Sequence, residues 1–74
     1  MIRNRVFTRI KGLRFDRRLT QSDVASMIGA YPTLVSQWEL GTLKVAEKWQ
    51  EQLSLFYEKP IEYLFDERGF AREE

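Results

Sequence analysis

The sequence predicts a compact, all-α domain of five helices. Three observations favour this class. Apolar residues recur at intervals of three and four in successive segments, glycine or proline separates those segments, and the 74 residues, without cysteine, can hold only one small core. Aromatic residues make up 14% of the chain and help to fill that core. We expect one domain over residues 1–74, with its core between about residues 5 and 66.

An amphipathic segment from Arg5 to Asp16 predicts the first helix. Its apolar stripe consists of Val6, Ile10 and Leu13, with Phe7 beside it. Because residues three or four apart share one face of a helix, this stripe is expected to pack on the rest of the domain.

The second helix has a recognisable signal at each end. Thr20 can accept a hydrogen bond from a free backbone N–H, and Asp23 favours the same positive helix end, so the helix is expected to start near Gln21. Gly29 ends it, because glycine enters the left-handed conformation without steric cost. Four apolar residues are expected on its buried side: Val24, Ala25, Met27 and Ile28.

The third helix is expected from Pro32 to Leu40. Proline suits the first helical turn, and Gly41 stops the helix. At about 100° per residue the segment has two sides. The inner side holds Leu34, Val35 and Trp38. The outer side holds Thr33, Gln37 and Leu40. Ser36 and Pro32 lie on the flanks between them. Two short helices joined by a turn with glycine form the pattern of a helix-turn-helix.

Glu39 falls on the inner side of the third helix, beside Val35. An unpaired carboxylate near the core costs several kcal/mol, so it needs a partner. Arg14, toward the end of the first helix, is the candidate for this structural ion pair.

Five short motifs carry a resemblance to a known family. They are Leu13-Arg14, Leu19-Thr20-Gln21, Val24-Ala25, Ile28-Gly29 and Trp38-Glu39-x-Gly41. In this order and spacing they resemble the DNA-binding domain of the Cro and phage-repressor class, the Xre-like helix-turn-helix family. The resemblance runs from about Val6 to Phe65 and implies a lambda-repressor-like fold in which Arg14 pairs with Glu39.

Two more helices complete this pattern. The segment Val45 to Tyr57 carries apolar residues at helical spacing, and Pro60 to Phe65 resembles the short fifth helix of the family. Trp38, Trp49 and Phe56 are expected in the core, because their spacing places them on buried stripes.

The outer face of the third helix can read DNA bases. A nine-residue helix is about 13 Å long and fits across a major groove. Gln37 can bond N6 and N7 of adenine together, and Thr33 can pair with a base or touch a thymine methyl group. The expected base contacts are Thr33, Gln37, Ser36 and Pro32.

Charge is distributed unevenly although the net charge is only +1. Residues 1–20 hold seven basic side chains against one acidic, a balance of +6, and residues 45–74 hold four against eight, a balance of −4. The basic end is expected to face phosphate. The family uses a glutamine matching Gln21 in this way. The expected contacts to the DNA backbone are Arg3, Arg5, Lys11, Thr20, Gln21, Tyr31, Thr42 and Lys44.

The resemblance implies a sequence-specific regulator of transcription that binds double-stranded DNA, a repressor of phage, mobile-element or bacterial origin, in the cytoplasm. The chain has no histidine or cysteine, so no enzyme, cofactor or metal is expected, and no membrane or small-molecule partner is evident. The alternative is a protein-interaction module, antitoxin-like or a co-regulator, that uses the same fold. Residues 21–43 contain no lysine or arginine, which favours that alternative.

A homodimer on a two-fold symmetric site is also expected, because one reading helix covers too few base pairs to define a genomic site. Residues 67–74 are expected to be either a flexible tail or part of the dimer contact. The candidate interface residues are apolar and follow the third helix: Leu43, Tyr63, Phe65 and Phe70.

Overall fold

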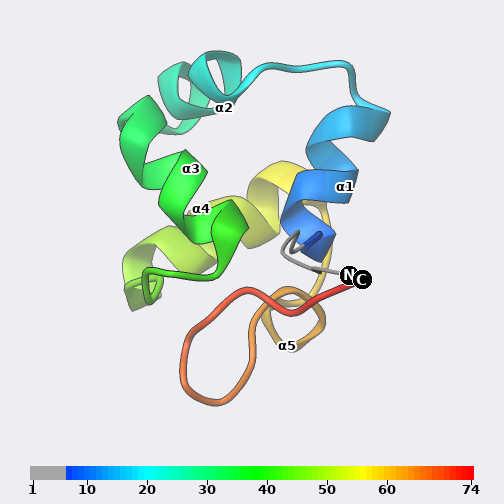
Figure 1. Cartoon of the computed structure of the whole chain (residues 1–74), viewed down its shortest axis with the longest axis vertical. Coiled ribbons are helices and arrows are strands. Elements are labelled where there is room, and N and C mark those ends of the chain that lie inside the picture. Colours follow the sequence, from blue (N-terminus) through cyan, green and yellow to red (C-terminus); the bar gives the residue numbers. More distant parts are fainter. Residues whose placement is uncertain (1–6) are drawn as a thin grey trace, which may run out of the picture.

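The structure is a computed structural model that describes residues 7–74 (Figure 1). Its helices are α1 (Arg9–Asp16), α2 (Gln21–Ile28), α3 (Pro32–Leu40), α4 (Glu47–Tyr57) and α5 (Ile61–Leu64). These described residues form five helices and no sheet, which confirms the all-helical class expected from the sequence. Within residues 7–74 no helix has the length and apolar character needed to cross a membrane.

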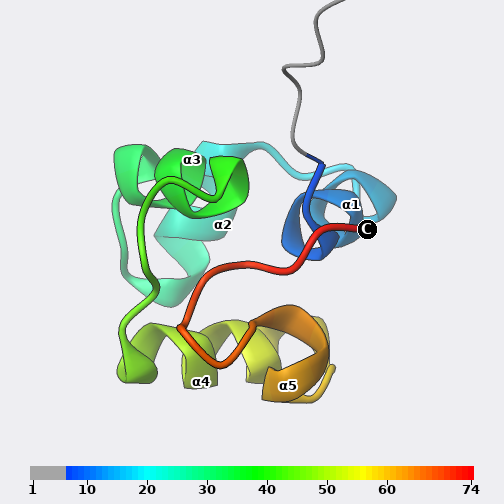
Figure 2. The same ribbon diagram turned by 60° about the horizontal axis from the view of Figure 1, so that its bottom comes forward.

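The helices form two layers, which are visible when the molecule is turned (Figure 2). α1, α2 and α3 lie in one layer, and α4 and α5 lie in the other. Residues after α5 turn back and run to the start of α1, so the last segment of the chain lies beside the first described one (Figures 1 and 2).

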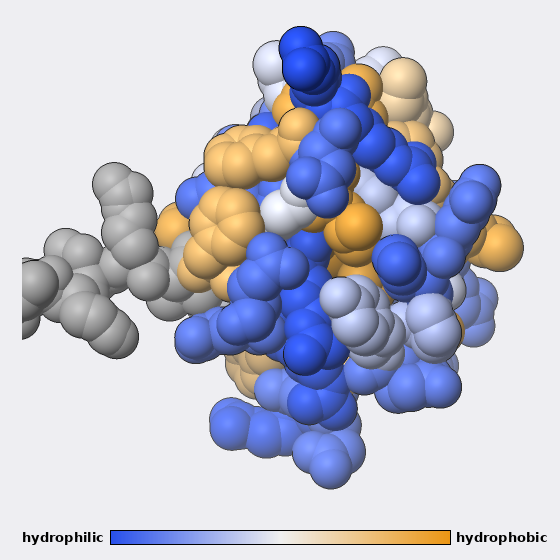
Figure 3. All heavy atoms as spheres, turned by 90° about the vertical axis from the view of Figure 1, so that its right-hand side faces the viewer, coloured by the Kyte–Doolittle hydropathy of each residue, from blue (hydrophilic) through white to orange (hydrophobic). Residues whose placement is uncertain are grey.

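α1 begins at Arg9, four residues later than expected from the pattern. Its N-cap, Thr8, has an extended backbone with φ −85° and ψ 162°. Thr8 also forms an antiparallel bridge with Glu73. Pairing with the chain end therefore keeps Phe7 and Thr8 out of the helix, and Arg5 and Val6 of the expected helix lie outside the described residues. On the side of the molecule that carries α1, hydrophilic side chains predominate and hydrophobic ones form small patches (Figure 3).

The ends of α2 and α3 are those expected from the sequence. The Thr20 hydroxyl accepts the Asp23 N–H at 3.0 Å, and the Thr20 N–H donates to the Asp23 carboxylate at 2.9 Å, forming a capping box. Gly29 ends α2 with φ +81°, and Gly41 ends α3 with φ +76°. Both glycines adopt the left-handed conformation that other residues reach only with strain.

Met27 was expected on the buried side of α2, and the structure corrects this, because its side chain is 61% exposed. Val24 and Ala25 are fully buried, and Ile28 packs against the core. On a helical wheel Met27 lies about 60° from Val24 on the side away from Ala25. The contact with the core is therefore centred on Val24 and Ala25 and stops short of Met27.

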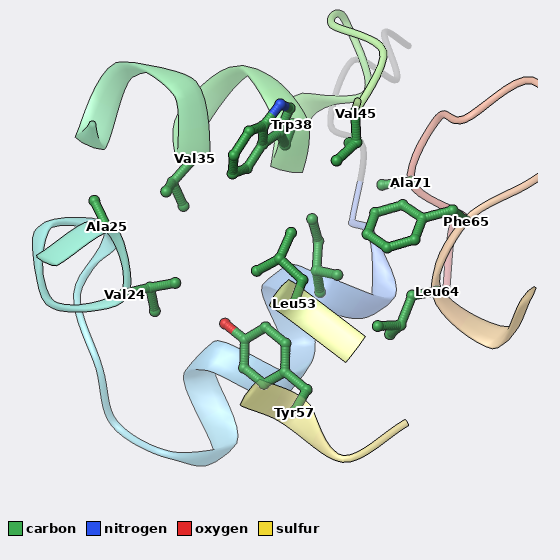
Figure 4. Close-up of a cluster of buried hydrophobic side chains, with 11 residues drawn as sticks. Val24, Ala25, Val35, Trp38, Val45, Leu53, Tyr57, Leu64, Phe65 and Ala71 are labelled. Carbon is green, nitrogen blue, oxygen red and sulfur yellow. The ribbon is translucent and has the colours of Figure 1, made fainter. Parts of the chain in front are cut away.

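The core lies between the two layers (Figure 4). Trp49 and Phe56, expected in the core, are only partly buried and pack against its edge. The Trp49 ring lies 5.7 Å from the Trp38 ring, measured between centroids. The fully buried hydrophobic residues, drawn from all five helices and their connections, are Ile10, Val24, Ala25, Val35, Trp38, Val45, Leu53, Tyr57, Leu64 and Phe65.

Residues after α5 are folded against the domain in this structure. They make backbone hydrogen bonds and antiparallel bridges with earlier parts of the chain. Asp66 N–H donates to the Phe70 carbonyl at 2.8 Å, and Phe65 and Ala71 form an antiparallel bridge. Gly69 has φ +91°, and its carbonyl accepts the Val45 N–H at 2.8 Å. This turn is therefore bonded both to itself and to the connection between α3 and α4.

Asp66 stabilises the turn through its carboxylate. One oxygen accepts the backbone N–H groups of Arg68 and Phe70, both at 2.9 Å, and the bond from Phe70 is the main cause that lowers the pKa of Asp66 below its ordinary value. The lowered pKa means that folding favours the ionised carboxylate.

Asp66→Asn is expected to destabilise the folded chain at pH 7, because a neutral amide oxygen is a weaker acceptor. The carboxylate's contribution is complete above the unfolded pKa, about 4, and is lost as the pH falls through the lowered pKa of the folded state. Urea unfolding from pH 7 to pH 2 should therefore show the two proteins converging in acid. Glu67→Gln, at the exposed neighbouring residue, is the control, and a stability difference independent of pH would contradict this role.

Candidate nucleic-acid interface

α3 presents one face to solvent and buries the other. Thr33, Gln37 and Leu40 are exposed, and Val35 and Trp38 are buried. Ser36 is half-buried on the flank, and Pro32 is exposed at the first turn. α3 therefore offers a short row of neutral side chains on a helix fixed from behind by the core.

Tyr31 precedes this row as the N-cap of α3. Its side chain is 72% exposed and makes no capping hydrogen bond. Its backbone carbonyl accepts the N–H groups of Leu34 and Val35 at 3.0 and 3.2 Å. The backbone of Tyr31 is therefore fixed at the start of α3, and its phenol is exposed there.

The amide group of Gln37 is available for an outside partner. Within residues 7–74 its side chain makes no hydrogen bond, and it is exposed. Its backbone carbonyl, in contrast, accepts both the N–H and the hydroxyl of Thr42, at 3.2 and 3.3 Å. Thr42 is thus held against the end of α3, and its hydroxyl proton is already used.

The expected ion pair between Arg14 and Glu39 is present and closes in two parallel hydrogen bonds. Arg14 Nε donates to Glu39 Oε2 at 2.7 Å, and Arg14 Nη2 donates to Oε1 at 2.9 Å. Both side chains are buried, and the bond to Glu39 is the main cause that raises the pKa of Arg14. Arg14 Nη1 donates to the Leu19 carbonyl at 2.9 Å, so the pair also fixes the connection to α2.

Gln21, an expected phosphate contact, is bonded inside the protein. Its Nε2 donates to Glu39 Oε1 at 3.1 Å, and the side chain is half-buried. This bond uses one amide N–H and leaves the second N–H and the carbonyl oxygen. Glu39 therefore connects α1, α2 and α3, and Gln21 is held in a fixed position at the start of α2.

The start of α2 carries both an attractive and a repulsive group for phosphate. The Thr20 hydroxyl accepts a bond within the capping box, so its proton can still be donated outward. The adjacent Asp23 carboxylate has a lowered pKa, mainly because the Thr20 backbone N–H bonds to it, and it is ionised at neutral pH. A phosphate near Thr20 would therefore lie close to a negative charge.

Three cations in α1 or directly after it contact other groups of the domain. Arg9 Nη1 donates to the Tyr63 carbonyl at 2.9 Å, and the Arg9 Cζ lies 4.3 Å from the centroid of the Tyr63 ring. Arg17 donates to the Phe56 carbonyl at 2.7 Å. Lys11 is half-buried, with Nζ 5.6 Å from the centroid of the Phe7 ring. The expected contacts Arg3 and Arg5 lie outside the described residues.

Arg18 is a candidate that the sequence reasoning did not single out. It is exposed in the turn between α1 and α2 and has a left-handed backbone, with φ +57°. Within residues 7–74 its guanidinium makes no hydrogen bond or ion pair. A signal was present in the sequence, because Arg18 stands two residues before the Thr20 cap.

Lys44, an expected phosphate contact, is exposed, with its aliphatic chain close to Gly69.

The structure divides the four residues expected at a dimer contact. Phe65 is only 2% exposed, so it belongs to the core. The expectation that it lies at a dimer interface was wrong. Leu43 is half-buried against the core, and Tyr63 is 39% exposed beneath Arg9. Phe70 is half-buried, with the Arg68 guanidinium 5.3 Å from its ring centroid.

Comparison of the chain with protein-family models, curated proteins and solved structures finds no significant match. The resemblance to the Xre-like family therefore stays a prediction. A functional assignment has to rest on the α3 face and the groups around it.

Proposed function

We propose that this protein is a regulator of transcription that binds specific sequences of double-stranded DNA. It would act as a repressor, as its resemblance to the Xre-like family implies. α2 and α3 serve as a lambda-repressor-like helix-turn-helix, and α3 enters the major groove. The observation that carries this proposal is the row formed by Thr33 and Gln37. Both side chains are exposed on a helix whose opposite face is fixed by buried Val35 and Trp38.

Base readout and backbone positioning are assigned to different side chains. Gln37 and Thr33 bind base edges, with Ser36 and Pro32 beside them. The DNA backbone contacts come from groups at the rim, which fix the register of the protein on the duplex but carry no sequence information. These groups are Arg18, Thr20, Gln21, Tyr31, Lys44 and Lys11. Thr42 would have to give up one of its two bonds to the Gln37 carbonyl before it could donate to a phosphate.

The Arg14–Glu39 pair has an electrostatic role in this arrangement. Glu39 lies one residue before the end of α3, where an unpaired carboxylate would repel phosphate. Its two oxygens accept three hydrogen bonds, two from Arg14 and one from Gln21. Neutralising this charge inside the domain leaves the exposed face of α3 without a charged side chain.

Titration of a fluorescent random-sequence duplex at low and moderate salt tests DNA binding directly. Neutralisation of phosphates releases counterions, so affinity should fall steeply as salt rises. Binding to no duplex at any salt concentration would refute the proposal. That result would favour the protein-interaction module, for which the exposed Leu55 of α4, 74% accessible, offers an apolar contact on another face.

Gln37→Ala is expected to weaken binding to the preferred site by about 1 to 3 kcal/mol, because it removes contacts to one base. Affinity for random DNA should change little. Gln52→Ala is the matched control, since Gln52 is an exposed helical glutamine on α4. Equal loss on preferred and random duplexes would instead make Gln37 a contact to the DNA backbone.

The DNA-bound form is expected to be a homodimer on two half-sites about 34 Å apart. The contact would involve the partly exposed apolar side chains that follow α3, namely Leu43, Tyr63 and Phe70. Sedimentation with a duplex that carries two half-sites should give two protomers for each duplex. A strict one-to-one complex on that duplex would contradict the dimer.

A further inference from the structure

The exposed face of α3 has no positive charge with which to read guanine. No lysine or arginine occurs between Gln21 and Leu43. Arg14, which contacts α3 from behind, already donates from Nε, Nη1 and Nη2 to Glu39 and the Leu19 carbonyl. The commonest specific contact in the major groove, a cation paired with guanine O6 and N7, therefore has no side chain from α2 or α3 to make it.

The chemistry of Gln37 favours adenine over guanine. Its free amide offers one acceptor oxygen and two donor hydrogens, and adenine presents the matching N7 acceptor and N6 donor. Guanine presents two acceptors at the same edge. An amide bound to both would leave its own carbonyl without a donor in a desolvated groove, which is unfavourable.

The remaining exposed groups of α3 are rich in carbon. Thr33 lies one turn before Gln37 and carries a methyl group, and the ring of Pro32 and the side chain of Leu40, 48% exposed, lie on either side along the helix. The C5 methyl of thymine is the apolar group of the major groove. Against cytosine the same carbons would cover the N4 amino donor and leave it unpaired.

We propose that α3 selects duplexes in which the contacted major groove consists mainly of A·T base pairs. Gln37 binds adenine, and the Thr33 methyl group, flanked by the carbons of Pro32 and Leu40, packs against thymine methyl groups. This inference rests on the proposed function, because it names the class of DNA that the same face binds.

Two base analogues test the inference on the unaltered protein, once selection from a random pool has yielded a preferred duplex. Uracil in place of thymine removes the methyl group and should weaken binding about fourfold for each methyl contacted. 7-Deazaadenine removes N7 and should weaken binding about fivefold at the adenine that Gln37 contacts.

Three variants assign these effects to side chains. Thr33→Ser removes only the methyl group and should abolish the effect of uracil at one position. Gln37→Ala should abolish the effect of 7-deazaadenine, and Gln52→Ala on α4 should keep both effects. All three side chains are exposed, so circular dichroism should show the same helical content in the variants as in the unaltered protein.

The outcomes separate this inference from the proposed function. Selected duplexes rich in G·C, or affinity insensitive to both analogues, would overturn A·T selection. Salt-sensitive binding to duplex DNA would then still support the proposed function. Absence of salt-sensitive binding to any duplex would overturn both.

Discussion

Arg14→Met is expected to destabilise the domain by about 3 kcal/mol or more, because it leaves the Glu39 carboxylate buried without its cation. Glu39 is only 2% exposed and would keep a single neutral donor, Gln21. Glu39→Leu should cost a similar amount by leaving the Arg14 guanidinium buried. The double variant should cost less than the sum of the two, since neither charge is then isolated. Denaturant unfolding measures all three.

A matched control separates the buried pair from an ordinary surface carboxylate. Glu51→Leu, at an exposed carboxylate on α4, is the control and should stay within about 0.5 kcal/mol. Strictly additive losses would mean that the pair does not interact.

Features that depend on neighbouring residues could be predicted from the sequence. Thr20 and Asp23 form the cap at the start of α2, and Gly29 and Gly41 end the two helices with positive φ. Each of these requires only groups within one helical turn. The inward position of Glu39 follows from helical periodicity in the same way, and the need to neutralise it led to Arg14.

Features that depend on distant residues could not be predicted in this way. Thr8 is excluded from α1 because it pairs with Glu73, near the other end of the chain. Arg9 could be read only as a free basic residue, although it bonds the Tyr63 carbonyl 54 positions away. The local pattern does not contain such partners. The sequence likewise could not show that the Gln21 amide donates to Glu39, whereas the Gln37 amide makes no hydrogen bond within residues 7–74.

Removal of residues 70–74 is expected to destabilise the domain by about 4 kcal/mol or more. The sequence alone left open whether residues 67–74 form a flexible tail or part of a dimer contact. Four backbone hydrogen bonds would be lost, each with a net value of about 1 kcal/mol. They run from Asp66 to Phe70 (2.8 Å), Arg72 to Leu64 (2.8 Å), Arg9 to Arg72 (2.9 Å) and Glu74 to Phe7 (2.9 Å). Burial of Ala71 and the cover over Phe65 would be lost as well.

A graded series of truncations makes this expectation specific. Removal of Glu74 alone takes away one of the four bonds and should cost about 1 kcal/mol, whereas removal through Phe70 should cost most of the stability that a domain of this size has. Urea unfolding of the series measures both steps. A tail that is free in solution would give no loss at either step, because residues that make no contact in the folded chain contribute nothing to its stability. The steep loss is expected because residues 70–74 join α1 to the end of α5, two elements that otherwise lie in different layers.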